Sequence, residues 1–130
     1  MLSHLSIGVS SLEDSGDFYD AVLAPLGCGR VWTSRSGIGY GPPGAQDKLA
    51  IFAQAPPIVR SSPGFHLAFA AVTRADVDLF HAAALAHGGA DAGAPGLRPR
   101  YGAGYYAAFV RDPDGHKLEA VCHENGASVS

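Results

Sequence analysis

The sequence has few charged residues and no long apolar run, and each shortage excludes a class of protein. Of its 130 residues 16% are charged and 47% are hydrophobic. This balance excludes intrinsic disorder, because a disordered chain combines low hydrophobicity with high net charge. No apolar stretch approaches the ~20 residues that cross a bilayer, so no membrane segment is expected. The formal net charge of −3 does not favour the basic stripe that binds nucleic acid.

Export and metal-binding cysteine motifs are also lacking. The N-terminal residues have neither the basic nor the apolar region of a secretory signal, and Cys28 and Cys122 form no CxxC pair. In a chain without an export signal, such cysteines are expected to be reduced thiols. We therefore expect a cytoplasmic globular protein, a single domain over residues 1–130, with a small-molecule or protein partner.

An internal repeat organises the chain. Residues 4–27 align without a gap with residues 66–89. The matched identities include His4 with His66, Asp14 with Asp76, Phe18 with Phe80, and Gly27 with Gly89. The repeat predicts two modules at about 1–56 and 64–123, joined by a Pro/Ser-rich segment and followed by a loose tail at 124–130.

Each module is expected to fold as βαβββ, which makes the fold class α+β with curved mixed sheets around a cleft. Alternating bulky and small residues at 5–9 and 65–69 predict a first strand. Ser11 and Thr73 are plausible N-caps of the helix that follows. The remaining strands are expected at about 29–34, 37–41, 48–53, 91–98, 104–111 and 117–123.

Strand alternation gives His4, His66 and Glu119 equivalent positions. In the last strand Glu119 alternates with apolar residues that should lie under the helix, so it faces the same side as His66. The repeat puts His4 on the matching face of its own module. If the two sheets are related by a two-fold axis, the three side chains meet in one cleft. Two imidazoles and a carboxylate form the facial triad that holds Fe(II) and also suits Mn(II). The alternative is that the histidines are structural.

Three segments resemble the vicinal oxygen chelate superfamily, which includes glyoxalase I, bleomycin-resistance proteins, fosfomycin-resistance enzymes and extradiol dioxygenases. They are His4-Leu5, FHLAF at 65–69 and DPDGHKLE at 112–119. The resemblance covers about residues 2–123. It implies that His4, His66 and Glu119 are the ligands of a divalent metal, which would be Fe, Mn, Zn or Ni. It also implies a homodimer.

The resemblance implies a metalloenzyme, a lyase or a dioxygenase, that chelates and activates a small oxygen-bearing substrate. Glyoxalase I has a fourth ligand on the last strand of its first module, where this sequence has Ala50. Alanine cannot bind a metal, and this departure puts lactoylglutathione lyase activity in doubt. The alternative function is metal-free binding of a small molecule such as a bleomycin-type antibiotic.

Further side chains are candidates for the same cleft. Either Tyr105 or Tyr106 must face it, where a phenol could donate to a metal-bound oxygen or simply fill space. His123 shares the face of Glu119 and could be a general base or an ordinary solvated strand end. Arg98 and Arg100 flank a loop that could receive an anionic substrate or be plain surface. Three other histidines are expected to be exposed: His81, His87 and His116.

Overall fold

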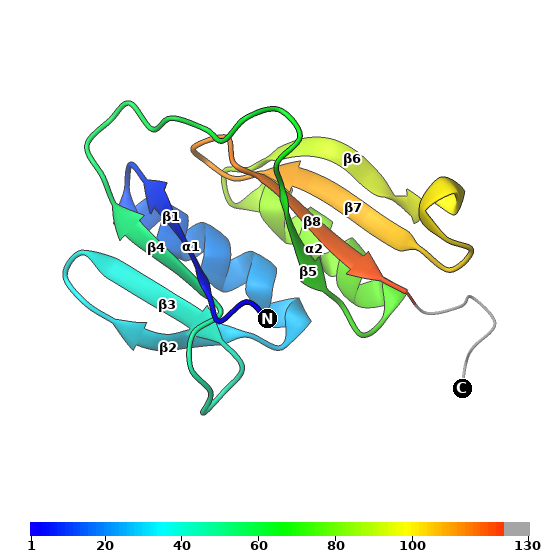
Figure 1. The fold of residues 1–130 in the computed structure, drawn as a ribbon, viewed down its shortest axis with the longest axis horizontal. Helices are drawn as coiled ribbons and strands as arrows, with labels where there is room; N and C mark the ends of the chain where they lie inside the picture. Colours follow the sequence, from blue (N-terminus) through cyan, green and yellow to red (C-terminus); the bar gives the residue numbers. More distant parts are fainter. Residues whose placement is uncertain (124–130) are drawn as a thin grey trace.

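The two expected modules each form a four-stranded sheet with one helix (Figure 1). The computed structural model describes residues 1–123; the expected tail at 124–130 lies outside the described residues. The first module consists of β1 (Leu5–Val9), α1 (Leu12–Leu23), the 3-10 turn η1 (Ala24–Leu26), β2 (Gly29–Thr33), β3 (Gly37–Gly41) and β4 (Leu49–Ala53). The second consists of β5 (Leu67–Ala70), α2 (Arg74–Ala86), β6 (Ala90–Leu97), the 3-10 turn η2 (Pro99–Tyr101), β7 (Tyr106–Arg111) and β8 (Lys117–Cys122). The α+β prediction is confirmed.

The helices begin at the expected caps. The Ser11 hydroxyl accepts a hydrogen bond from the backbone N–H of Asp14 at 3.1 Å, and Thr73 does the same for Asp76 at 3.1 Å. Each bond satisfies a backbone donor that the first helical turn leaves without a partner. Phe80, on the inner face of α2, is fully buried.

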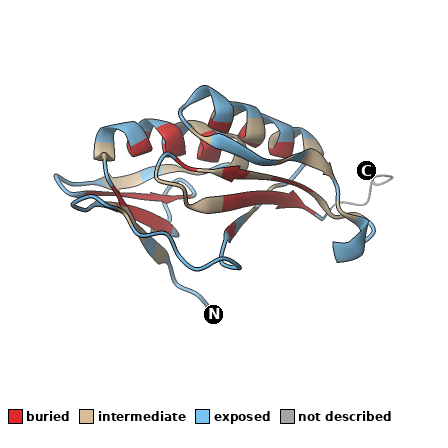
Figure 2. Ribbon diagram, turned by 90° about the horizontal axis from the view of Figure 1, so that it is seen from above, coloured by how far each residue is buried: buried red, intermediate tan, exposed pale blue. Residues whose placement is uncertain are grey.

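The sheets are mixed, with strand orders β1-β4-β3-β2 (sheet A) and β5-β8-β7-β6 (sheet B). In each, the first and last strands of the module pair in parallel. Figure 2 shows both helices on the same side of the two sheets, and α1 packs against α2. We call the sheet faces turned away from the helices the open faces. Both open faces therefore point the same way.

The turn between β7 and β8 ties the second module to the first. Asp112, buried in this turn, accepts a 2.6 Å hydrogen bond from the Tyr19 hydroxyl of α1. Burial, reinforced by Asp112, raises the pKa of Tyr19 well above its usual range, so this phenol remains a donor. Asp114 accepts from the backbone N–H of Ser10 at 3.0 Å.

The prediction that the three further histidines are exposed is wrong for two of them. His116 is half-buried, and its Nε2 lies 2.8 Å from the carbonyl oxygen of Gly8 in the other module. The His81 side chain is 13% exposed and its Nε2 lies 2.8 Å from a carboxylate oxygen of Asp91. Sequence position alone could not reveal these long-range partners. His87 is exposed as expected.

Within residues 1–123 no disulfide joins Cys28 and Cys122. Among residues 1–123, no helix is long and apolar enough to cross a membrane.

Candidate functional site

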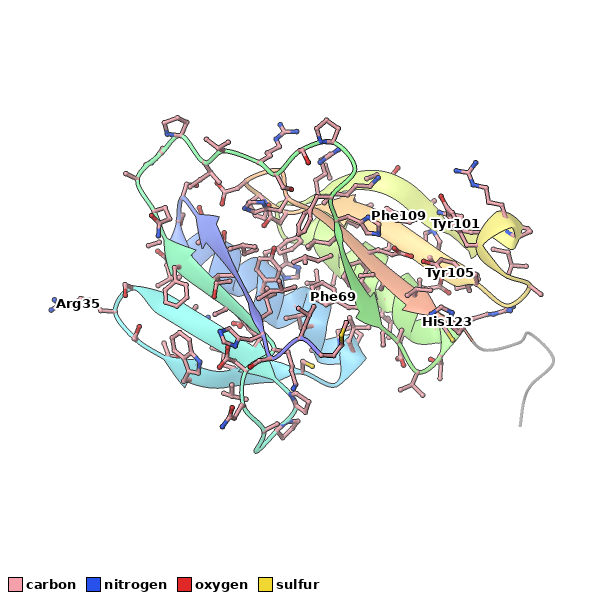
Figure 3. All side chains as sticks on the ribbon, in the orientation of Figure 1. Arg35, Phe69, Tyr101, Tyr105, Phe109 and His123 are labelled. Carbon is pink, nitrogen blue, oxygen red and sulfur yellow. The ribbon has the colours of Figure 1, made fainter. Side chains whose placement is uncertain are left out.

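The candidate site is a cavity of about 1080 Å³ on the open face of sheet B. His66, Tyr105, Phe109 and Glu119 form its floor, and they come from β7, β8 and the residues next to β5 and β7. The rim is basic and aromatic, with Arg98, Arg100, Tyr101 and Lys117. Figure 3 shows Tyr101, Tyr105, Phe109 and His123 grouped on this sheet.

Glu119 is the central residue of the cavity. Its register partner on β5 is Ala68, so the carboxylate emerges beside the position of His66, two residues earlier. His66 Nε2 lies 2.7 Å from Glu119 Oε1, and the Tyr105 hydroxyl donates to the other oxygen, Oε2. The residue is only 1% exposed. Burying a carboxylate is costly unless both oxygens find partners, and these two contacts supply them.

The two tyrosines before and on β7 point to opposite faces. Tyr105 faces the cavity, while the Tyr106 hydroxyl donates to Asp78 of α2 at 2.7 Å. Burial, followed by the hydrogen bond to Glu119, raises the pKa of Tyr105 to about 12. Tyr105 is therefore protonated at neutral pH and acts as a donor. His123 lies exposed at the end of β8, with its ring perpendicular to that of Tyr105 at 5.2 Å between centres.

Phe109 and Lys117 were missed by the sequence reasoning. Phe109 is the register partner of Glu119 on β7, and its ring contacts His66 edge-on at 5.7 Å between centres. Lys117 Nζ lies 5.1 Å from the same ring centre. Strand alternation could have found both, because Phe109 has the parity of Tyr105, and Lys117 has the parity of Glu119.

The structure does not bring His4 to this cluster within one chain. His4 is exposed and its Nδ1 lies 3.0 Å from the Ser3 hydroxyl. Residues 1–123 contain no group of three or more His, Cys, Asp or Glu side chains that could hold a metal ion. The reason is that the two open faces lie side by side and point the same way (Figure 2), so matching residues of the two modules do not converge.

The open face of sheet A is apolar where that of sheet B is polar. Ala50 of β4 is the counterpart of Glu119 of β8. Ala50 pairs with Ser6 on the first strand of its module, as Glu119 pairs with Ala68 on the first strand of the other. Trp32 packs against Phe52 at 5.8 Å between ring centres. The Trp32 side chain covers Gly39, where a Cβ atom would lie within 2.0 Å of it. This face therefore offers aromatic surface rather than further ligands.

The donor set of sheet B fits part of a metal site. Imidazole and carboxylate suit Fe, Mn and Zn. Donor atoms in adjacent positions around such an ion, with bonds of about 2.1 Å, lie about 3 Å apart. His66 Nε2 and Glu119 Oε1 are 2.7 Å apart, the length of a direct hydrogen bond, so an ion would have to replace that bond. Sites of this kind take three protein ligands, and a single chain would supply two of the three.

The fold consists of paired βαβββ modules, and its open cavity contains an imidazole–carboxylate pair. These two features together indicate the class of protein. The family model described as the Glyoxalase/Bleomycin resistance protein/Dioxygenase superfamily matches residues 1–120. The chain belongs to this superfamily. No protein with a curated description matches the sequence.

Solved structures agree with this assignment. A glyoxalase/bleomycin resistance protein from Albidiferax ferrireducens T118 is 37% identical, with a TM-score of 0.79 over 94% of this chain and 98% of that chain. A putative glyoxalase from Bacillus halodurans is 29% identical, with a TM-score of 0.70 over 94% and 95% of the two chains. The fosfomycin resistance protein FosX from Mesorhizobium loti, 22% identical with a TM-score of 0.66 over 94% and 91%, shares the fold.

Proposed function

We propose that the protein is a metal-dependent enzyme, a lyase or a dioxygenase, that works as a cytoplasmic homodimer on a small oxygen-bearing substrate. Its divalent metal (Fe, Mn, Zn or Ni) would be held by His66 and Glu119 of one chain and His4 of a second copy. The observation that carries this proposal is the Glu119 carboxylate, 1% exposed and 2.7 Å from an imidazole nitrogen, at the floor of an open cavity.

The arrangement of the modules supports the homodimer. Both open faces point the same way (Figure 2), so a second copy related by a two-fold axis can lay its sheet A over the sheet B of the first. A two-fold interface uses the same patch on both copies, so one such contact would complete two identical sites. The aromatic surface of Trp32 and Phe52 would then close the cavity, and His4 would enter with it.

Each residue of the site would have a distinct part in the chemistry. When bound, the metal would act as a Lewis acid towards adjacent oxygens of the substrate. His66 and Glu119 would hold it. Tyr105, protonated because its pKa is raised to about 12, orients Glu119 by donating its one O–H to Oε2. His123, beside Tyr105 at the exposed end of β8, would act as a general base.

Metal-free binding of a small molecule, such as a bleomycin-type antibiotic, is the second candidate function. One observation favours it: both oxygens of Glu119 already have partners, His66 and Tyr105, within the protein. A carboxylate satisfied in this way does not require a metal. The aromatic rim of the cavity would then provide the binding surface.

Metal titration decides between the two functions. We expect calorimetry with Mn(II), Zn(II), Ni(II) and anaerobic Fe(II) to show about one site per chain in the native protein. His66→Ala, Glu119→Gln and His4→Ala should each weaken binding by about tenfold or more. His87→Ala removes an exposed histidine from the end of α2 and should leave the affinity unchanged. If none of the four ions binds, the metal-free function is the correct one.

A further inference from the structure

The cavity on sheet B gathers positive charge although the chain as a whole is acidic. Arg98, Arg100 and Lys117 line it, whereas the formal net charge of the protein is −3. Among the described residues that line the cavity, Glu119 is the single carboxylate. It is already paired with His66 and Tyr105. Within residues 1–123, none of the three cations takes part in an ion pair with a carboxylate.

Arg98 is held in place at the rim by its surroundings. Its Nη2 donates to the carbonyl oxygen of Ala94 at 2.8 Å, and its guanidinium carbon lies 5.6 Å from the centre of the Phe109 ring. Gly93 and Gly96 leave the room for it, because Cβ atoms there would lie 3.3 Å and 3.2 Å from its two terminal nitrogens. The hydrogen bond to Ala94 uses one of the five N–H donors of the Arg98 guanidinium. The guanidinium therefore has further donors for a ligand.

Lys117 approaches the same ring from β8. Its Nζ lies 5.1 Å from the ring centre of Phe109, so two cations share one aromatic side chain. Both cations line the cavity, so an anion that reaches them would gain charge-assisted hydrogen bonds. The arrangement is therefore suited to an anionic ligand.

The walls beside these cations are aromatic. Tyr101 and Tyr105 contact each other with ring centres 5.3 Å apart, and both line the cavity. Figure 3 shows them with Phe109 on sheet B. Aromatic faces of this kind bind the apolar body of a ligand. The lining therefore suits a ligand that combines an organic body with an anionic group.

We propose that this cavity binds a small organic acid whose carboxylate or phosphonate group pairs with Arg98 and Lys117. The body of the acid lies against Tyr101 and Tyr105 and reaches towards Glu119. The proposal deepens the proposed function and rests on it in one respect, that this cavity is the ligand site. It needs no bound metal.

The test uses probes of matched shape and different charge. Benzoate, phenylphosphonate and the neutral benzamide are titrated at millimolar concentration into the metal-free protein, and binding is followed by NMR shifts of backbone amides. We expect benzoate or phenylphosphonate to bind at least about tenfold more tightly than benzamide, since charge-assisted hydrogen bonds are stronger than neutral ones. The tighter of the two anions identifies the acid group.

Charge-removing variants locate the binding. Arg98→Gln and Lys117→Gln should each weaken the better anion about tenfold. They lie on different segments, so misfolding of one variant leaves the other informative. Arg35→Gln removes an equal charge from the exposed turn between β2 and β3, far from the cavity of its own chain (Figure 3), and should have no effect.

Three results would overturn the proposal. They are equal affinity for benzamide and the anions, an equal loss of affinity in Arg35→Gln, and no shift with either anion. These titrations contain no metal, so anion binding can be found in a protein that binds no metal. Equally, metal binding can be found in a protein that binds neither anion. The two proposals are therefore tested separately.

Discussion

At the scale of single residues, the difference between the two modules lies in a few exchanged side chains. Glu119 of β8 corresponds to Ala50 of β4. Phe109 is the register partner of Glu119, and Gly39 is the register partner of Ala50. In each module an aromatic ring covers a glycine of the neighbouring strand, but the two strands exchange roles. In the first module Trp32 of β2 covers Gly39 of β3, and in the second Phe109 of β7 covers Gly93 of β6. A few substitutions thus make one open face polar and the other aromatic on the same backbone plan.

Tyr105 can be tested against its neighbour. Tyr105→Phe removes the donor to Glu119 Oε2, and loss of such an outer partner of a metal ligand typically costs about tenfold or more in metal affinity. Tyr106→Phe removes the same atom on the opposite face, where it donates to Asp78. We expect weaker metal binding by calorimetry in the first variant and unchanged binding in the second. Equal affinities in the two variants would exclude a role for Tyr105 in orienting Glu119.

At the scale of elements, the turn at 112–116 has a structural role. Asp112 Oδ1 accepts from the backbone N–H groups of Asp114 and His116, both at 2.9 Å, while Oδ2 accepts from Tyr19. One buried carboxylate therefore shapes the turn and fastens it to α1. The DPDGH segment at 112–116, which carries much of the family resemblance, thus holds the two modules together. None of its residues lines the sheet B cavity.

Asp112→Ala should be strongly destabilising. It removes three hydrogen bonds and leaves the buried Tyr19 hydroxyl without its partner, and an unsatisfied buried donor costs about 1–3 kcal/mol. We expect the free energy of unfolding, measured in urea, to fall by about 3 kcal/mol. Asp114→Ala removes a less buried carboxylate that accepts a hydrogen bond from the backbone N–H of Ser10, and should cost about 1 kcal/mol or less. Similar losses in the two variants would contradict the clamp role of Asp112.

At the scale of the whole molecule, the placement of the modules determines what one chain can do. Both sheets turn their open faces to the same side (Figure 2), so His66 and Glu119 meet but His4 stays apart. Under the proposed function, His4 of one copy would complete the site that His66 and Glu119 of the other copy begin. The site would then be a property of the dimer.

Mixed dimers test this arrangement directly. His4→Ala and His66→Ala chains, co-expressed with different tags and purified through both, should regain one intact metal site per dimer. The other site would carry both substitutions. If each site were built within one chain, the mixed dimer would have no intact site. The measurement is the metal content per dimer, with each variant homodimer as the control.

The local features of this protein follow from its sequence. Both modules, the caps at Ser11 and Thr73, and the shared face of His66 and Glu119 follow from periodicity and capping, which act over a few neighbouring residues. Three other features could be seen only in the folded chain: His4 stands apart, His116 reaches Gly8, and Arg98 and Lys117 share the Phe109 ring. These contacts depend on how two sheets pack and on hydrogen bonds between distant segments, and neither leaves a periodic pattern in the chain.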